Sequence, residues 1–288
     1  MSMRILLVPL FGSEIDAIGL EAGLGVAQRF GAHVNGLFVR IDPRDAIPVI
    51  GEGVSPAVID QLIEAAAAEM DRRSAAGRDA FEAACGKAGV AISDAPREPG
   101  TVSAGWGEVT GRRDAVLARK ARVSDLTVLP RPDEQTPPEL DRDLEAILFG
   151  AGRPLLIVPP QAAPGPGRTV AVAWNDSAEA ARAVAGALPF LETADAVHVL
   201  CAKTWRTEAD ADLDLMQYLQ WRGIACTRHA VTAEDEPVGA ALLKAAAEVG
   251  ADLLVMGGYG RTRLSELVLG GVTRHVLAHS PLPLLLSH

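Results

Sequence analysis

The chain has 288 residues, of which 49% are hydrophobic and only 4% aromatic. This length favours two domains, and this composition favours buried parallel strands of small aliphatic residues covered by Ala-rich helices. The formal net charge of -10 argues against a general surface for nucleic acid or anionic membranes. The three cysteines are widely spaced, which disfavours a disulfide framework or a structural zinc site and fits a reducing compartment. No apolar run reaches the length of a signal peptide or membrane span, so we expect a cytoplasmic protein.

Strand and helix patterns alternate through the first half of the chain. Buried-strand patterns are expected at 4–10, 33–40, 88–92, 125–129 and 155–158. Helical periodicity is expected at 15–30, 56–84, 112–121 and 139–148. Ser13 is the expected N-cap of the first helix, and Gly31 is its expected C-cap. The Gly/Ser-rich stretch 97–107 is not assigned, and 106–109 is an alternative strand.

A Pro/Gly-rich segment divides the chain. Residues 159–167 read Pro-Pro-Gln-Ala-Ala-Pro-Gly-Pro-Gly, a density of Pro and Gly that stops any regular element. The sequence therefore predicts one domain at 1–160, a linker at 161–167 and a second domain at 168–288.

The second half repeats the pattern of the first. Strands are expected at 168–174, 196–202, 224–231, 251–255 and 282–286. Helices are expected at 178–188, 212–221 and 236–249, and helical spacing returns between Leu267 and Leu277. Five strands alternating with helices predict right-handed parallel crossovers and a doubly wound α/β sheet in each half.

Two turns of the second half are expected to form a cleft. Ligands of doubly wound sheets bind beyond the carboxyl ends of the strands, where the strand order reverses. There the turn 174–177 would meet the glycine-rich turn that begins at Gly257. A strand, a glycine loop and a helix can hold phosphate through backbone N–H groups. The spacing Gly257-x2-Gly260-x9-Gly270 matches neither a Walker A loop nor a Gly-x-Gly-x-x-Gly loop.

The same residues resemble a known family. Residues 256–262 with 269–272 resemble the loop of the universal stress protein family, whose ATP-binding members carry Gly-x2-Gly-x9-Gly-(Ser/Thr/Asn) after the fourth strand. Residues 173–181 resemble that family's first turn. The resemblance covers both halves. It implies two flavodoxin-like (adenine-nucleotide α-hydrolase-like) domains packed as a pseudo-dimer through their last strands, 155–158 and 282–286.

The resemblance also implies a ligand, an adenine nucleotide such as ATP, with Mg²⁺ as its companion. Its expected contacts come from the two turns and the following helix: Ala173, Trp174, Asn175, Ser177, Met256, Gly257, Gly260, Arg261, Gly270, Gly271, Val272 and Thr273. Three positions depart from the family pattern. Asn175 replaces an acid, Asp176 replaces a glycine, and Gly271 replaces the Ser, Thr or Asn that binds phosphate. In the first half, 130–134 holds two acids and no glycine, so we expect at most one nucleotide per chain.

Several of these residues have simpler explanations. The glycines suit turns that need positive φ, and a tryptophan at a strand end often serves packing. Arg261 suits phosphate binding and a solvated loop about equally. Asp176 fits an N-terminal turn better than Mg²⁺ or ribose. His275 and His279 have metal-chelating spacing, but no third ligand is evident, so surface histidines are favoured.

We find no nucleophile, base and orienting residue in a recognisable set, so an enzyme is not favoured. The leading hypothesis is a stress-response protein that binds ATP as a regulatory ligand and acts through unidentified protein partners. A nucleotide-free scaffold and a slow ATPase are the alternatives. No nucleic-acid or membrane partner is expected, and a further homodimer stays open.

Overall fold

The computed structural model describes residues 2–42, 56–95, 97–133, 136–202, 211–233, 236–258 and 271–288. Its first half runs β1 (Ile5–Leu10), α1 (Asp16–Phe30), β2 (His33–Arg40), α2 (Pro56–Ala88), β3 (Ser103–Thr110), α3 (Arg113–Ala121), β4 (Leu126–Pro130), α4 (Glu139–Gly150) and β5 (Leu155–Val158). Its second half runs β6 (Thr169–Trp174), α5 (Ala178–Glu192), β7 (Ala196–Ala202), α6 (Ala211–Trp221), β8 (Thr227–Val231), α7 (Val238–Glu248), β9 (Leu253–Gly257), α8 (Gly271–His279) and β10 (Leu284–Ser287). The α/β fold expected from the sequence is confirmed.

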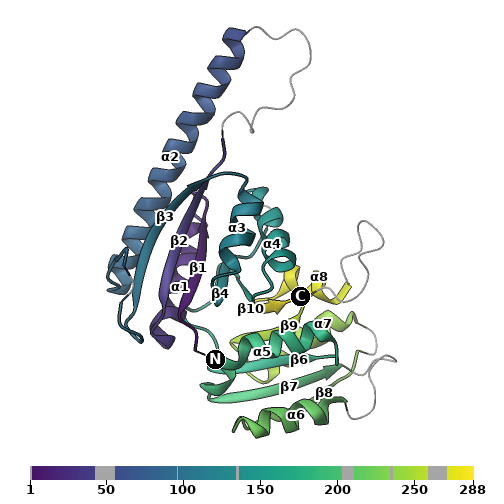
Figure 1. Ribbon diagram of the computed structural model, residues 1–288. Coiled ribbons are helices and arrows are strands. Elements are labelled where there is room, and N and C mark those ends of the chain that lie inside the picture. The colour runs from purple at the N-terminus through teal and green to yellow at the C-terminus, as the bar shows by residue number, and fades with distance from the viewer. Residues whose placement is uncertain are drawn as a thin grey trace.

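All these strands join in a single sheet (Figure 1). Its order is β3-β2-β1-β4-β5-β10-β9-β6-β7-β8, so each half contributes five neighbouring strands. Pairing is parallel within each half, and β5 and β10 meet antiparallel, with Leu284 opposite Ile157 and Leu286 opposite Leu155. The halves are therefore joined as a pseudo-dimer through their last strands, as the resemblance implies. This pairing also removes two exposed strand edges.

Helices cover both faces of the sheet. Alternate residues of a strand point to opposite faces, so Leu6 and Leu7 belong to different core clusters. One cluster contains buried residues of α1, α2, α5 and α6, and the other contains residues of α3, α4, α7 and α8. Among the described residues, no helix combines the length and the hydropathy needed to cross a bilayer.

The third strand lies elsewhere than predicted. Residues 88–92 were expected to form it, but α2 continues to Ala88, and Ile92 makes only an isolated bridge to Ala104. The strand is Ser103–Thr110, which pairs with β2 from His33↔Ser103 to Arg40↔Thr110. The glycines of this segment make the strand hard to recognise from the sequence. A Cβ at Gly105 would lie 3.2 Å from both the His33 ring and the Ser93 carbonyl oxygen, so the close approach of neighbouring chains favours glycine there.

Candidate functional site

The predicted cleft lies where the strand order of the second half reverses. β6 and β9 are parallel neighbours, with Ala173 opposite Met256. β7 and β8 lie on the outer side of β6, whereas β10 lies on the other side of β9. The carboxyl ends of β6 and β9 thus form the switch point at which doubly wound sheets bind ligands. Trp174 and Gly257, which are far apart in the sequence, end these two adjacent strands.

The turn after β6 is held by its own side chains. The Ser177 hydroxyl donates to Asn175 Oδ1 at 2.7 Å, and the Ser177 N–H donates to the same oxygen at 3.3 Å. Ser177 Oγ in turn accepts from the Ala180 N–H at 3.1 Å, so Ser177 is the N-cap of α5. The turn therefore fixes the N-terminus of a 15-residue helix, whose dipole favours an anion, beside the strand ends.

Asp176 has the backbone conformation that suits glycine. Its φ is 57°, and no other described non-glycine residue has positive φ. This left-handed conformation is uncommon for residues with a Cβ, although Asp and Asn adopt it more readily than most. The family pattern that the sequence resembles has glycine at this place, a residue that adopts positive φ without steric cost.

Gly257 brings the second turn against the first. A Cβ at Gly257 would lie 2.6 Å from the Ala180 amide nitrogen and 2.8 Å from the Glu179 carbonyl carbon. Only a residue without a side chain lets the end of β9 approach the first turn of α5 so closely. Two predicted site segments are thereby in direct contact.

The first half of the chain reaches the start of the glycine loop, a feature that the sequence did not predict. Gly258 N–H donates to the Ser287 carbonyl at 2.8 Å, and His288 Nδ1 donates to the Gly258 carbonyl at 3.0 Å. The His288 ring packs edge-on against Phe149 of α4, with ring centroids 4.8 Å apart. A Cβ at Gly258 would also lie 3.3 Å from Leu148. α4 of the first half is therefore packed against Gly258 and His288 of the second half.

The other predicted site residues contribute in different ways. Gly260, Arg261 and Gly270 lie outside the described residues. Side chains that pack in or against the core clusters are those of Ala173, Trp174, Met256 and Val272. Gly271 opens α8, and a Cβ there would meet no atom of the described residues within 4 Å, whereas Thr273, two residues later, is buried.

The helical histidine pair of α8 interacts within the helix. The rings of His275 and His279 are stacked with centroids 4.3 Å apart, and His279 Nδ1 donates to the His275 carbonyl at 2.8 Å. The ring nitrogens thus do not converge on a common point as metal ligands would.

The equivalent turn of the first half is occupied by the protein itself. Asp16 accepts the N–H groups of Phe11 and Gly12, both at 2.8 Å, and that of Ser13 at 3.4 Å. Ser13 was predicted to cap α1, but the helix begins without a side-chain cap bond and the Ser13 hydroxyl has no partner among the described residues. Burial raises the pKa of Asp16, while these backbone donors oppose that shift. The N–H groups that a phosphate would need are already bonded to a carboxyl group.

Helix α2 crosses this occupied turn. A Cβ at Gly12 would lie 2.1 Å from the Arg73 carbonyl oxygen, and Arg73 Nε donates to the Phe11 carbonyl at 2.8 Å. The expectation of no phosphate in the first half was based on the acids after β4. The structure adds a second obstacle, because α2 and Asp16 together fill the place that corresponds to the cleft of the second half.

A buried ion pair lies beneath the same turn. Arg113 Nε donates to Asp143 Oδ2 at 2.6 Å, Arg113 Nη1 donates to the Leu10 carbonyl at 3.1 Å, and the guanidinium stacks over Phe11 at 4.2 Å. Burial raises the pKa of Asp143 to about 6, against the opposing effect of the Arg113 charge. This pair ties α3 and α4 to the end of β1.

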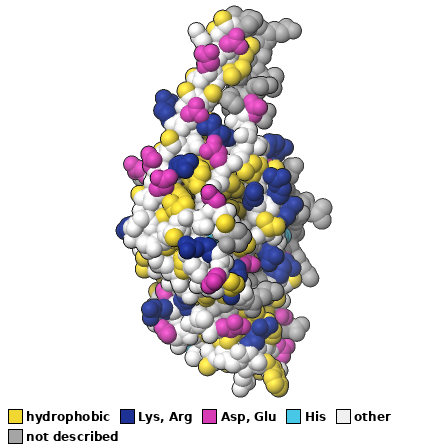
Figure 2. All heavy atoms as spheres, turned by 60° about the vertical axis from the view of Figure 1, so that its left-hand side comes forward, with side chains coloured by type: hydrophobic (Ala, Val, Ile, Leu, Met, Phe, Trp, Pro, Cys, Tyr) yellow, Lys and Arg dark blue, Asp and Glu magenta, His cyan; other side chains and the backbone are white. Residues whose placement is uncertain are grey.

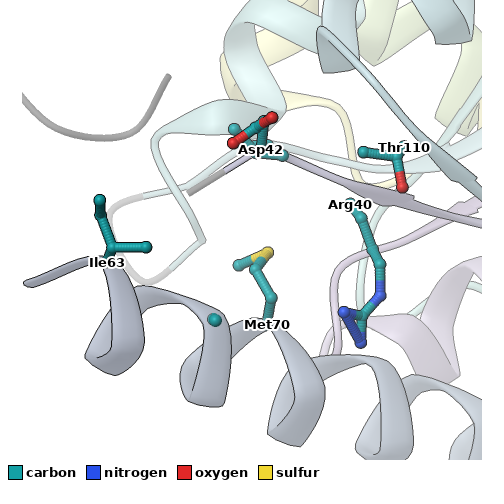
Figure 3. A pocket seen from close by; sticks show the side chains of 7 residues that line it. Arg40, Asp42, Ile63, Met70 and Thr110 are labelled. Atoms are coloured by element: carbon teal, nitrogen blue, oxygen red, sulfur yellow. The ribbon is translucent and has the colours of Figure 1, made fainter. Parts of the chain in front are cut away.

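A hollow of about 280 Å³ lies between α2 and the carboxyl ends of β2 and β3 (Figure 3). Its lining comes from Arg40, Ile41, Asp42, Ile63, Ala67, Met70 and Thr110. Arg40, the cation of this lining, already forms salt bridges with Asp71 at 2.5 Å and with Glu108. A second hollow, of about 450 Å³, is lined by α6 and the chain before β8. Neither hollow is lined by the turns at the ends of β6 and β9, so we do not assign a nucleotide to either.

Comparison with known proteins agrees with this arrangement. The model of the "Universal stress protein family" matches residues 167–288. Over the whole chain, the fold is similar to a universal stress protein from Archaeoglobus fulgidus, with a TM-score of 0.69, 18% identity, and coverage of 100% of this chain and 99% of that one. A functionally unknown protein from Pseudomonas aeruginosa PAO1 aligns with a TM-score of 0.57 and 17% identity, covering 99% and 92%. A putative universal stress protein from P. aeruginosa UCBPP-PA14 has the same TM-score with 16% identity, covering 99% and 93%.

The comparison with curated proteins found no match. Because the family model matches residues 167–288, the second half of the chain is a universal stress protein domain. The whole chain shares the fold of a universal stress protein of nearly equal length.

Proposed function

We propose that this protein is a cytoplasmic stress-response protein whose second half binds an adenine nucleotide, ATP above all, as a regulatory ligand. The observation that carries the proposal is the contact of the two predicted turns at the β6/β9 switch point. There the Asn175–Ser177 turn, the N-terminus of α5 and Gly257 lie together. These are the elements that hold phosphate through backbone N–H groups and a helix dipole.

The departures from the family pattern define how the nucleotide would be held. Ser177 already engages Asn175 Oδ1, so a ribose hydroxyl would meet the Asn175 amide as a donor rather than a carboxylate. Gly271 offers no hydroxyl to a phosphate. We therefore expect weaker binding than the intact family pattern would give, with backbone N–H groups as the main phosphate ligands.

The packing at Gly258 supports a regulatory role. This residue lies against Leu148, and its carbonyl is bonded to His288, which packs on Phe149. A nucleotide that moves Gly258 would change its contact with Leu148 of α4, and so bias how the two halves pack. A ligand shifts a conformational equilibrium only through such differential contacts.

The test is isothermal titration of the full chain with ATP and Mg²⁺, with GTP as the competing nucleotide. Ser177→Ala should weaken ATP binding by about tenfold, because it removes a hydroxyl and loosens the turn. Ser13→Ala, at the corresponding turn of the first half, is the matched control and should leave binding unchanged. Absence of heat with ATP at 100 μM protein, together with unchanged hydrogen exchange at Gly257 and Gly258, would refute nucleotide binding.

A nucleotide-free scaffold is the second candidate, favoured by a specific contact. Asn175 Oδ1 is fully used inside its own turn, as expected of a residue that only shapes the loop. The two candidates differ in what the purified protein carries. Adenine nucleotide released on denaturation and detected by chromatography at a stoichiometric level supports the first, and its absence combined with a null titration supports the second.

A further inference from the structure

Helix α2 is longer than its packing on the sheet requires. It has 33 residues, or about 50 Å at 1.5 Å per residue, and its N-terminal part extends beyond the end of the sheet (Figure 1). From Ala57 to Arg73 no residue is buried. Buried positions begin at Ser74 and include Phe81 and Cys85, which pack against the body. About half of the helix is therefore free of the core that stabilises the rest.

The two sides of α2 differ. Ile63, Ala67 and Met70 line the hollow that faces Arg40 and Thr110 (Figure 3). The opposite side carries a row of residues spaced alternately by four and three, all of them exposed. We call it the outer stripe: Val58, Leu62, Ala65, Glu69, Arg72, Ala76, Asp79, Ala83 and Gly86.

The outer stripe has the spacing of a helix–helix contact. An alternating four–three repeat places its members along one seam, as in coiled coils, and small residues let two helices approach closely. Its two large apolar members, Val58 and Leu62, are 43% and 45% exposed. Hydrophobic side chains are visible among charged ones on this projecting end of the molecule (Figure 2).

The charges of α2 favour an antiparallel partner of the same kind. Residues 57–71 contain four acids and no Lys or Arg, whereas 72–88 contain four basic residues and two acids. Two copies packed antiparallel would set each acidic segment against a basic one, whereas a parallel pair would set acid against acid. Glu69 and Arg72 already meet within one helix and are exposed to solvent.

We propose that the outer stripe of α2 is a homodimer interface, in which α2 of a second copy packs antiparallel about a two-fold axis between residues 70 and 71. A two-fold contact is self-complementary, so one residue pair is made twice. In this register Glu69 of each copy faces Arg72 of the other. Ala65 then faces Ala76, Val58 faces Ala83, and Leu62 faces Asp79, which lies between Ala76 and Ala83 of the second copy. The edges of β5 and β10 are already paired inside the chain, so a second copy must use another surface.

Sedimentation equilibrium of the full chain between 1 and 100 μM tests the interface. The wild type should associate to a dimer. Glu69→Arg should raise the dimer dissociation constant at least tenfold, because it places two like charges across each half of the two-fold contact. The double variant Glu69→Arg with Arg72→Glu should restore dimerisation, since the pairs are remade with reversed signs.

Leu62→Glu should also weaken the dimer, while Val123→Glu is its matched control. Val123 is 71% exposed in the turn after α3 and does not belong to the outer stripe. Circular dichroism and thermal melts check that each variant stays folded. A wild type that stays monomeric at 100 μM overturns the proposal. A dimer that persists in Glu69→Arg and Leu62→Glu overturns it as well, because association must then use another surface, such as the outer edge of β8.

Discussion

Gly257 lies so close to Ala180 that a methyl group on Gly257 would stand 2.6 Å from the Ala180 amide nitrogen. The neighbouring atoms belong to the backbone of α5, so they cannot move aside as a flexible side chain would. The contact fixes the end of β9 against the start of the helix that Ser177 caps. The geometry of the candidate cleft therefore depends on a missing side chain as much as on the side chains present.

Gly257→Ala should consequently lower both stability and nucleotide affinity. Forcing a methyl group into this contact should cost about 1–3 kcal/mol in the free energy of unfolding. Gly271→Ala is the control, because a Cβ there meets no atom of the described residues, and Ala is a better helix former than Gly. Urea denaturation measures both. Equal losses in the two variants would contradict the steric account.

Gly271→Ser tests the departure from the family pattern directly. The resemblance places a phosphate-binding Ser, Thr or Asn at this position, and no atom of the described part of the chain lies within 4 Å of a Cβ at Gly271. We expect ATP to bind several-fold more tightly to Gly271→Ser, because a hydroxyl–phosphate hydrogen bond is worth about 1 kcal/mol. Titration of Gly271→Ala alongside separates the hydroxyl from the change in helix propensity. An affinity no higher in the serine variant than in the alanine variant would place Gly271 away from the phosphates.

Asp176 offers a test of backbone strain. With φ at 57°, Asp176→Ala should destabilise the protein by about 1 kcal/mol, since alanine tolerates the left-handed region poorly. Asp176→Gly should be neutral or stabilising, because relief of the left-handed strain offsets the greater freedom of glycine in the unfolded chain. Thermal unfolding of both variants gives the comparison. A lower melting temperature for glycine than for alanine would show that the aspartate side chain, not the conformation, matters.

The corresponding turns of the two halves should respond differently to loss of a hydroxyl. Ser177→Ala removes the N-cap of α5 and should cost about 1 kcal/mol. Ser13→Ala should cost little, because the Ser13 hydroxyl has no partner among the described residues. Asp16→Ala should cost more than either, about 2–3 kcal/mol, because it strips the acceptor from backbone N–H groups at a buried position. The ranking Asp16, Ser177, Ser13, measured by denaturant unfolding, is the prediction, and a different order would contradict it.

Much of the fold could be predicted because its signals are local. Continuous apolar runs such as Leu155–Val158 and 253–256 indicate buried strands without further context. Gly31, with φ at 62°, ends α1 as predicted. The switch point followed from strand order alone, which is why Trp174 and Gly257 could be placed together before any coordinates.

The misplaced features depend on contacts that are distant in sequence. β3 contains Gly105 because β2 and the Ser93 segment crowd it, and crowding cannot be read from Ser103–Thr110 alone. Asp16 replaces Ser13 at the first turn because its carboxyl group reaches several N–H groups at once. The packing of His288 on Phe149 required knowing how the two halves meet.

A histidine pair on β7 and β8 should make stability depend on pH. His198 Nδ1 and His229 Nε2 are 2.9 Å apart, a distance at which one ring donates and the other must be neutral to accept. Burial, with a smaller effect from the charge of His229, lowers the pKa of His198 below its usual value. The unfolded chain, with an ordinary histidine pKa of about 6.5, therefore binds this proton more readily than the folded chain does. The contribution of His198 to the free energy of unfolding is therefore fully present above a pH of about 6.5, and it is lost as the pH falls below that value.

The measurement is the free energy of unfolding of wild type and His198→Gln between pH 7.5 and 5. Glutamine keeps a hydrogen-bonding partner for His229 but does not titrate. As the pH falls, the free energy of unfolding should therefore decrease more for the wild type than for His198→Gln. Taking the difference cancels the other groups that titrate in this range, among them His33, whose pKa burial also lowers. The same comparison with His275→Gln of α8 shows what loss of any histidine contributes. A difference between wild type and His198→Gln that stays constant with pH would mean that the two rings of the pair do not resist protonation in the folded state.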